Sequence, residues 1–179
     1  MIEEQKTISN KLIDKNPYWE YHIDEYALSN GKIYNYYFVN TPGSTFVIPK
    51  NDKNNYILTK QYRYLNKKIS IEFPGGGQKT DLSSLQNAIN ELSEETGYFT
   101  NNITKIGEFN PFNGVTNEIC SVYLATDLEL KQQNLDETEQ IEIIELSYNQ
   151  INQMISSGEI WDGMTLAAWA IFNFSKEKK

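Results

Sequence analysis

The sequence predicts an α+β fold in which a mixed β-sheet is sandwiched between helices, with an antiparallel hairpin or sheet at the N-terminus. Strand-like and helical segments mix along the chain without strict β-α-β alternation, which is typical of α+β layers. The 12 tyrosines, 8 phenylalanines and 3 tryptophans among 179 residues suit a protein rich in sheet. One strongly marked helix follows a run of glycines in the middle of the chain.

The N-terminal hairpin is expected over residues 18–39. Two aromatic-rich strands there flank Asn30-Gly31, a pair suited to the positive φ angles of a tight turn. A Thr-Pro-Gly sequence that ends at Gly43 then interrupts the strand pattern. We therefore expect an N-terminal β-hairpin extension at 1–43, which is a candidate dimerisation element, and a main domain at 44–179.

The main domain shows further strands and two C-terminal helices. Runs rich in β-branched and aromatic residues predict strands at 44–48, 56–64, 103–109, 118–126 and 139–146. Helices are expected at 148–157, where Gly158 ends the helix, and at 164–174. The single cysteine, Cys120, lies in one of the strands, so we expect a buried thiol and no internal disulfide.

The helix after the glycines is the best-marked element. Ser83 and Gln86 have the spacing of a capping box at its start, and Gly97 stands where a left-handed C-terminal cap is wanted. One apolar stripe repeats at helical spacing and is expected to face the core: Leu85, Ala88, Ile89 and Leu92.

Three glutamates of this helix, Glu91, Glu94 and Glu95, lie off that stripe. Glu91 and Glu95 are one turn apart, and Glu94 is adjacent to them. Clustered carboxylates repel one another unless a cation lies between them, and hard oxygen ligands suit Mg²⁺, Mn²⁺ or Ca²⁺. Because Mg²⁺ keeps positions for water and for phosphate oxygens, the pattern indicates metal-assisted phosphate chemistry.

Composition argues against two classes of partner. A net charge of −8 disfavours general nucleic-acid binding, which needs a basic surface. No run of about 18 apolar residues is present, so no membrane span is expected. The first residues resemble neither a secretory signal nor a transit peptide, and we expect a cytoplasmic protein.

His22, the only histidine, is expected to be a surface or packing residue of the N-terminal hairpin.

The stretch from Gly76 to Tyr98 resembles the Nudix hydrolase signature, Gly-x5-Glu-x7-Arg-Glu-(apolar)-x-Glu-Glu-x-Gly-(apolar). The matching positions are Gly76, Glu91, Leu92, Glu94, Glu95, Gly97 and Tyr98. Three further segments resemble the branch of the family that cleaves ADP-ribose and related nucleotide sugars: 16–19, 61–63 and 158–165. The resemblance covers most of the chain and implies the Nudix fold.

The resemblance implies hydrolysis of the diphosphate bond of a nucleoside diphosphate sugar, dependent on Mg²⁺, with Mn²⁺ as an alternative ion. ADP-ribose is the first candidate, and the products would be a nucleoside monophosphate and a sugar phosphate. Glu91, Glu94 and Glu95 would bind the metal together with the backbone carbonyl of Gly75, because a glycine turn lets the main chain approach closely. Such an ion neutralises the diphosphate and lowers the pKa of a bound water.

The resemblance also implies a general base on the loop before the last strand. Glu139 matches that position best, and Glu137 is the runner-up. A position on a loop would let the base close over the substrate only when it is bound. We group these two glutamates with Glu91 as the candidate catalytic residues.

Four residues are candidates for contact with the substrate. Arg63 resembles the family arginine that binds a substrate phosphate, a task that suits a planar guanidinium. Trp19 or Tyr18 could stack on a nucleobase, and Glu118 lies in a loop that resembles the loop lining the family's pocket. Similar enzymes are homodimers, and we expect the same here through the N-terminal hairpin.

Two signature positions differ, because Leu82 stands at the glutamate and Asn90 at the arginine. In the family these two charges help to orient the metal-binding helix, and losing both together avoids leaving one charge stranded. Two alternatives stay open. The chain could be a catalytically weakened Nudix domain that binds a nucleotide sugar as a sensor, or a Nudix pyrophosphatase for nucleoside triphosphates.

Overall fold

The computed structural model describes residues 2–131, 133 and 140–176. The chain forms two compact units. The first comprises Met1–Gly43 and the segment Asn110–Ile119, and the second comprises Ser44–Phe109 and Cys120–Lys179. No helix in the described residues is long and apolar enough to cross a membrane.

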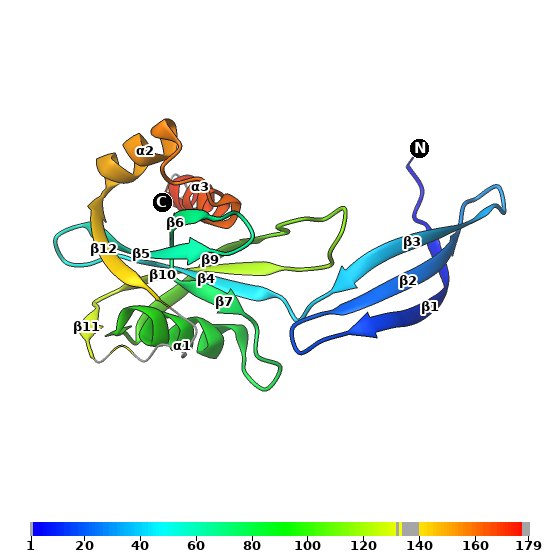
Figure 1. The fold of residues 1–179 in the computed structure, drawn as a ribbon, viewed down its shortest axis with the longest axis horizontal. Helices are drawn as coiled ribbons and strands as arrows, with labels where there is room; N and C mark the ends of the chain where they lie inside the picture. The colour runs from blue at the N-terminus through cyan, green and yellow to red at the C-terminus, as the bar shows by residue number, and fades with distance from the viewer. Residues whose placement is uncertain (1, 132, 134–139, 177–179) are drawn as a thin grey trace. The chain divides into compact units, whose positions relative to one another are not determined.

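The first unit is built on a three-stranded antiparallel sheet in the order β1-β2-β3 (Figure 1). Its strands are β1 (Lys6–Lys15), β2 (Glu20–Ala27) and β3 (Ile33–Asn40). The predicted N-terminal antiparallel element is confirmed, and Gly31 in the β2–β3 turn has a φ of 79°. Strand β1 was not predicted, because its residues are exposed on both faces and therefore show no apolar alternation.

The segment Asn110–Ile119 is held along β3. The backbone N–H of Val39 donates to the carbonyl of Val115 at 2.8 Å, and the Tyr36 hydroxyl donates to the carbonyl of Gly114 at 2.9 Å. These bonds occupy part of the outer edge of β3, so the segment extends the sheet although the bonded residues Tyr36 and Gly114 are 78 positions apart.

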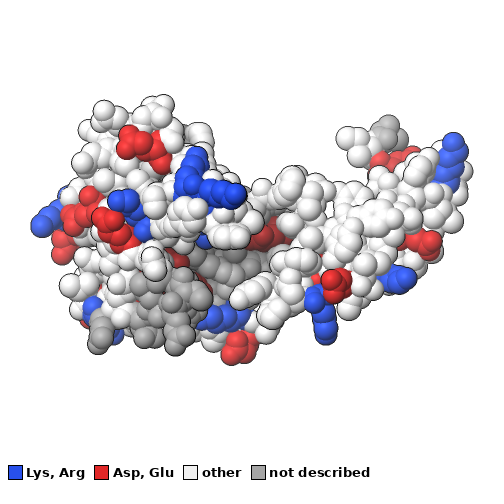
Figure 2. All heavy atoms as spheres, in the orientation of Figure 1, with Lys and Arg blue, Asp and Glu red and all other residues white. Residues whose placement is uncertain are grey.

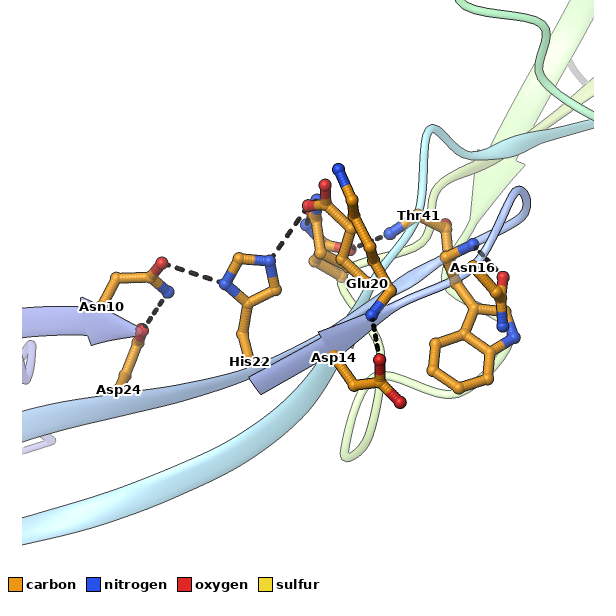
Figure 3. A network of polar contacts seen from close by, with 11 residues as sticks. Asn10, Asp14, Asn16, Glu20, His22, Asp24 and Thr41 are labelled. Atoms are coloured by element: carbon orange, nitrogen blue, oxygen red, sulfur yellow. Dashed lines mark hydrogen bonds and ion pairs between the residues drawn. The ribbon is translucent and has the colours of Figure 1, made fainter. Parts of the chain in front are cut away.

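His22 belongs to a polar network on this sheet (Figure 3). Its Nδ1 lies 2.9 Å from Oδ1 of Asn10, and its Nε2 lies 3.0 Å from Oε2 of Glu20. The hydrogen bond with His22, and then that from Asn40, lowers the pKa of Glu20. The imidazole also stacks on Phe38, with ring centroids 5.4 Å apart. His22 is therefore a packing residue of the sheet, as predicted.

The second unit contains a mixed four-stranded sheet in the order β7-β4-β10-β9. At its centre, β4 (Ser44–Pro49) runs parallel to β10 (Cys120–Thr126). The outer strands, β7 (Gly75–Gly77) and β9 (Asn102–Phe109), are antiparallel to their neighbours. Cys120 is buried, as predicted.

Two smaller sheets complete the second unit. Strands β12 (Glu142–Ser147), β5 (Asn55–Arg63) and β6 (Lys68–Glu72) form an antiparallel sheet in that order. Strands β8 (Tyr98–Phe99) and β11 (Glu129–Leu130) form a two-stranded ladder.

Helices cover both faces of the mixed sheet (Figure 1): α1 (Ser84–Thr96) lies on one face and α3 (Gly163–Lys176) on the other, with α2 (Tyr148–Ser157) beside α3. Successive side chains of β4 point to opposite faces. Val47 packs against the α1 side with Ala88 and Leu92. Its neighbours along the strand, Phe46 and Ile48, belong to the cluster on the α3 side, together with Trp169 and Phe172 of that helix. The predicted α+β fold, a mixed sheet between helices, is confirmed.

Helix α1 has the predicted ends. The Ser83 side chain accepts from the backbone N–H of Gln86, and Gly97 adopts a φ of 71°. The predicted apolar stripe is wrong at Leu85, which is 44% exposed. Part of the buried face is instead polar: Asn87, Glu95 and Thr96 accompany Ala88 and Leu92.

Candidate active site

The glycine strand β7 packs directly on its neighbours. A Cβ atom added to Gly75 would clash with the carbonyl oxygen of Thr45, and one added to Gly76 would lie 2.6 Å from Oε2 of Glu91. The contact at Gly75 is with backbone, so a side chain is excluded there, whereas a side chain at Gly76 would displace the Glu91 carboxylate. The Glu91 carboxylate therefore lies directly against the main chain of β7.

The second carboxylate on this strand is that of Glu95. Its Oε2 accepts a hydrogen bond of 3.0 Å from the backbone N–H of Gly75, and the residue is only 6% exposed. Glu91 and Glu95 are one helical turn apart. The structure thus brings both predicted carboxylates of this pair to one strand of consecutive glycines.

Glu94 is placed differently. Its carboxylate forms an ion pair of 3.3 Å with Lys79 and is 40% exposed. Within the described ranges, no group of three or more His, Cys, Asp or Glu side chains is arranged to hold a metal ion. The structure therefore brings two of the three predicted glutamates to the glycine strand. The predicted metal ligand of Gly75 is its carbonyl, and the bond seen in the structure is the one from its N–H group to Glu95.

The residues at β7 fit a hard divalent cation. Glu91 and Glu95 supply carboxylate oxygens, the ligand type that Mg²⁺ and Mn²⁺ prefer. The strand beside them carries no side chains, and a Cβ at Gly76 would fill the space next to the Glu91 carboxylate. Donor chemistry and space both suit such an ion.

Arg63, at the end of β5, is held by Glu72 at the end of β6. Nε of Arg63 donates to Oε1 of Glu72 at 2.7 Å, and Nη2 pairs with the second oxygen. The Glu72 side chain is 2% exposed, whereas that of Arg63 is 44% exposed. The hydrogen bond to Glu72 is the main cause of a raised pKa of Arg63. Burial opposes this shift, and the charge of Glu72, followed by those of Asp162 and Glu95, adds to it. Arg63 therefore lies within the electrostatic reach of the Glu95 carboxylate.

The chain before the glycines is fixed from α3. The backbone N–H of Phe73 donates to Oγ1 of the buried Thr165 at 3.2 Å, and the Thr165 amide donates to Oδ2 of Asp162 at 2.7 Å. This places the segment 158–165, which carried part of the resemblance, next to the start of the glycine strand.

The remaining predicted substrate residues lie in the first unit. Tyr18 is 80% exposed, and Trp19 is 41% exposed. Glu118 is half-buried in the segment Asn110–Ile119. The candidate bases Glu137 and Glu139 lie outside the described residues, so their role stays a prediction.

Among the described residues, no hydrogen bond joins Leu82 to Asn90, the two altered signature positions. The side-chain oxygen Oδ1 of Asn90 accepts from Nε2 of Gln86 at 3.0 Å, one turn back on the same helix. Leu82 is half-buried, and its backbone carbonyl accepts from Nε2 of Gln78 at 2.8 Å. The Asn90 side chain thus bonds within its own helix.

Sequence reasoning missed two polar residues of this region, Glu72 and Asn87. Both are buried, with exposures of 2% and 0%. For Glu72 a signal existed: Ser70 and Glu72 alternate in a short strand, and a carboxylate facing inward needs a cationic partner, which the neighbouring strand offers in Arg63. For Asn87 no sequence signal distinguished it from a solvated helix residue.

Comparison with known proteins identifies the family. The NUDIX domain family model matches residues 40–165. An ADP-ribose pyrophosphatase of Bacillus subtilis (strain 168) is 30% identical over 167 residues, with 92% of this chain and 90% of the relative covered. A methanol dehydrogenase activator of Bacillus methanolicus has the same identity and coverage. A GDP-mannose pyrophosphatase of Escherichia coli (strain K12) is 27% identical over 180 residues, with 93% of each chain covered.

Among solved structures, one titled "Crystal structure of ADP compounds hydrolase" superimposes with a TM-score of 0.84 at 16% identity, covering 97% of this chain and 94% of the other. At that identity the likeness concerns the fold. The family match spans most of the chain and contains the glycine strand, α1 and the Glu91–Glu95 pair. The chain therefore belongs to the Nudix family and is a Nudix hydrolase.

Proposed function

We propose that this Nudix hydrolase cleaves the diphosphate bond of a nucleoside diphosphate sugar, with ADP-ribose as the first candidate and Mg²⁺ as the required ion, replaceable by Mn²⁺. The products are a nucleoside monophosphate and a sugar phosphate. One observation carries the proposal: the Glu91 and Glu95 carboxylates both lie against the glycine strand. The names of the pyrophosphatase relatives support the substrate class.

Each residue has a defined task in this proposal. Glu91 and Glu95 hold the cation, Glu94 adds a further carboxylate, and the ion, when bound, neutralises the diphosphate and activates water. Arg63 binds a phosphate oxygen. Its fork with Glu72 uses Nε and Nη2, whereas a guanidinium carries five N–H donors, so the pairing orients the group and leaves donors for the substrate.

A substrate panel tests this function. Purified protein is incubated with ADP-ribose, GDP-mannose, nucleoside triphosphates and dinucleoside polyphosphates, and monophosphate release is followed by chromatography. We expect release from a nucleotide sugar with Mg²⁺ and none after chelation with EDTA. Release of monophosphate from nucleoside triphosphates alone would contradict the nucleotide-sugar assignment and make triphosphates the substrate class.

The sensor alternative is favoured by Leu82 and Asn90, which leave the signature without its ion pair. Titration calorimetry with ADP-ribose separates it from the enzyme. A saturable heat of binding without any product from the panel would overturn hydrolysis and favour a binding protein.

The general base is expected to be Glu139. Replacing it with glutamine removes the proton acceptor, so kcat should fall on the order of 100-fold or more, and the acidic limb of the pH–rate profile should disappear. Glu137→Gln is the matched control, because it changes a neighbouring carboxylate in the same way. A large loss in Glu137→Gln with little change in Glu139→Gln would reverse the assignment.

We also propose a homodimer formed through the sheet of the first unit. This sheet exposes large apolar side chains: Ile8, Leu12, Ile13, Ile33, Tyr34, Tyr36 and Tyr37. On the face shown in Figure 2, its surface is largely uncharged, with a few scattered acidic and basic residues among those described. An exposed apolar surface of this kind commonly marks a site of contact with another protein, which would bury it.

Light scattering should give twice the mass of the 20.7 kDa chain. Tyr37→Glu, at a tyrosine that is 55% exposed, is expected to shift the protein toward monomer. Tyr64→Glu alters a more exposed tyrosine of the second unit and should leave the dimer intact. A monomeric wild-type protein would contradict the proposal.

A further inference from the structure

Asn87 is a buried amide in the middle of α1, and it forms three hydrogen bonds away from its own helix. Its Nδ2 donates to Oγ1 of Thr45 at 2.9 Å and to the carbonyl of Gly77 at 3.3 Å. Its Oδ1 accepts from the backbone N–H of Lys79 at 3.0 Å. The residue has no exposed surface. One side chain therefore ties α1 to β4, to β7 and to the loop that follows β7.

Asn87 lies on the same line of the helix as the two site carboxylates. Residues 87, 91 and 95 follow one another at intervals of one turn and so share a face. Each of them meets a different glycine of β7. Asn87 bonds to Gly77, Glu91 lies against Gly76, and Glu95 bonds to Gly75. The three contacts run in opposite order along helix and strand, so they define one register between the two elements.

The three contacts differ in what they need from their surroundings. Glu91 and Glu95 carry the carboxylates that are proposed to receive the cation, so their contacts with the strand are part of the ion's own site. Asn87 is neutral, fully buried and bonded through both ends of its amide, so its geometry does not depend on a cation. Of the three, it is the contact whose side chain is not a proposed ligand of the ion.

We propose that Asn87 is a positioning residue for Glu91 and Glu95, which locks α1 onto the glycine strand in the register that the carboxylate pair requires. The two charges that orient this helix in the resembled signature are absent here. Positions 82 and 90 hold Leu82 and Asn90, and the Asn90 side chain is bonded within its own helix. The inference rests on the proposed function only for the identity of the ion that the pair receives.

The test compares three variants of the full chain. Asn87→Ala removes all three bonds. Thr45→Val keeps the volume of a buried side chain and removes one acceptor of Asn87. Ser84→Ala is the matched control, because it removes a different bond between α1 and the sheet, from the Tyr123 hydroxyl to Oγ of Ser84 at 2.9 Å, at the end of the helix away from the carboxylates.

Mn²⁺ binding without nucleotide, followed by electron paramagnetic resonance, is the first readout. Partners of metal ligands typically change metal affinity by 10- to 100-fold, so we expect Asn87→Ala to raise the Kd for Mn²⁺ by about tenfold, with Thr45→Val intermediate and Ser84→Ala unchanged. The second readout is the amide resonance of Gly75, which donates to Glu95. It should move in Asn87→Ala and stay in place in Ser84→Ala, with or without metal.

Equal Mn²⁺ affinities in Asn87→Ala and Ser84→Ala, together with an unmoved Gly75 resonance, would overturn the inference. If Asn87→Ala does not fold, the comparison of Thr45→Val with Ser84→Ala decides in the same way. A wild-type protein that hydrolyses no member of the substrate panel but keeps the expected order of Mn²⁺ affinities would remove the proposed function and leave the role of Asn87 standing.

Discussion

Glu95→Gln is expected to lower kcat for the nucleotide-sugar substrate by at least on the order of 100-fold, since even the partners of metal ligands are typically worth 10- to 100-fold. Glutamine keeps the size of the side chain, and its amide oxygen can still accept from the backbone N–H of Gly75. What disappears is the negative charge beside Glu91 that a divalent cation needs. Steady-state kinetics over a range of Mg²⁺ concentrations measure the loss.

The matched control for this change is Glu108→Gln. Glu108 is an exposed carboxylate paired with Lys105 on the surface of β9 at 2.6 Å. Exposed pairs of this kind contribute little to stability, so the control should keep wild-type kcat and thermal unfolding. Wild-type turnover in Glu95→Gln would show that the pair at the glycine strand is not the metal site. A collapsed far-UV circular dichroism spectrum would instead reveal a structural role for the charge.

Arg63→Met is expected to destabilise the protein by about 3 kcal/mol, because it leaves the carboxylate of Glu72 buried without its partner. Methionine retains the apolar stem of the arginine, so the loss reports the charge and its hydrogen bonds rather than packing. Glu72→Gln should cost less, because the half-exposed guanidinium of Arg63 can turn to water. Urea unfolding measures both changes.

The double variant Arg63→Met with Glu72→Gln gives the sharper comparison. Removing both charges relieves the stranded carboxylate, so the double variant should be more stable than Arg63→Met alone. Additive losses would mean that the two side chains are not energetically coupled. In the same proteins, KM for the nucleotide sugar should rise whenever Arg63 is absent, because the guanidinium is the proposed phosphate ligand.

Local signals explain why much of the fold was predictable. Helix α1 begins at Ser83 and ends at Gly97 as expected, since capping depends on residues a few positions apart. The pair Glu91 and Glu95 followed from spacing along a single helix, whereas the glycine run, expected as a turn, forms strand β7. Strand β1 was missed because side chains that face water on both sides leave no period in the sequence.

The missed parts of the site depend on contacts between distant segments. Asn87 reads as an ordinary polar helix residue until Thr45, 42 positions earlier, is placed beside it. Leu85 fits the apolar period yet lies exposed, because the helix turns its polar side chains toward the glycine strand. A single-sequence pattern assumes that the buried face of a helix is apolar, and in α1 the site requires otherwise.

The segment Asn110–Ile119 makes the two units inseparable by a simple truncation. It connects β9 to β10 of the second unit, yet it forms hydrogen bonds to β3. A shortened protein starting at Ser44 would keep this ten-residue excursion and lose the strand that holds it. The chain passes between the two units at three places, after Gly43, after Phe109 and after Ile119. Cleavage at Gly43 would cut one of them, and the released N-terminal piece could still pair with the segment Asn110–Ile119 of the remaining polypeptide. Engineering an isolated hydrolase core therefore requires two edits to the gene, a deletion at the start and a short replacement turn between Phe109 and Cys120.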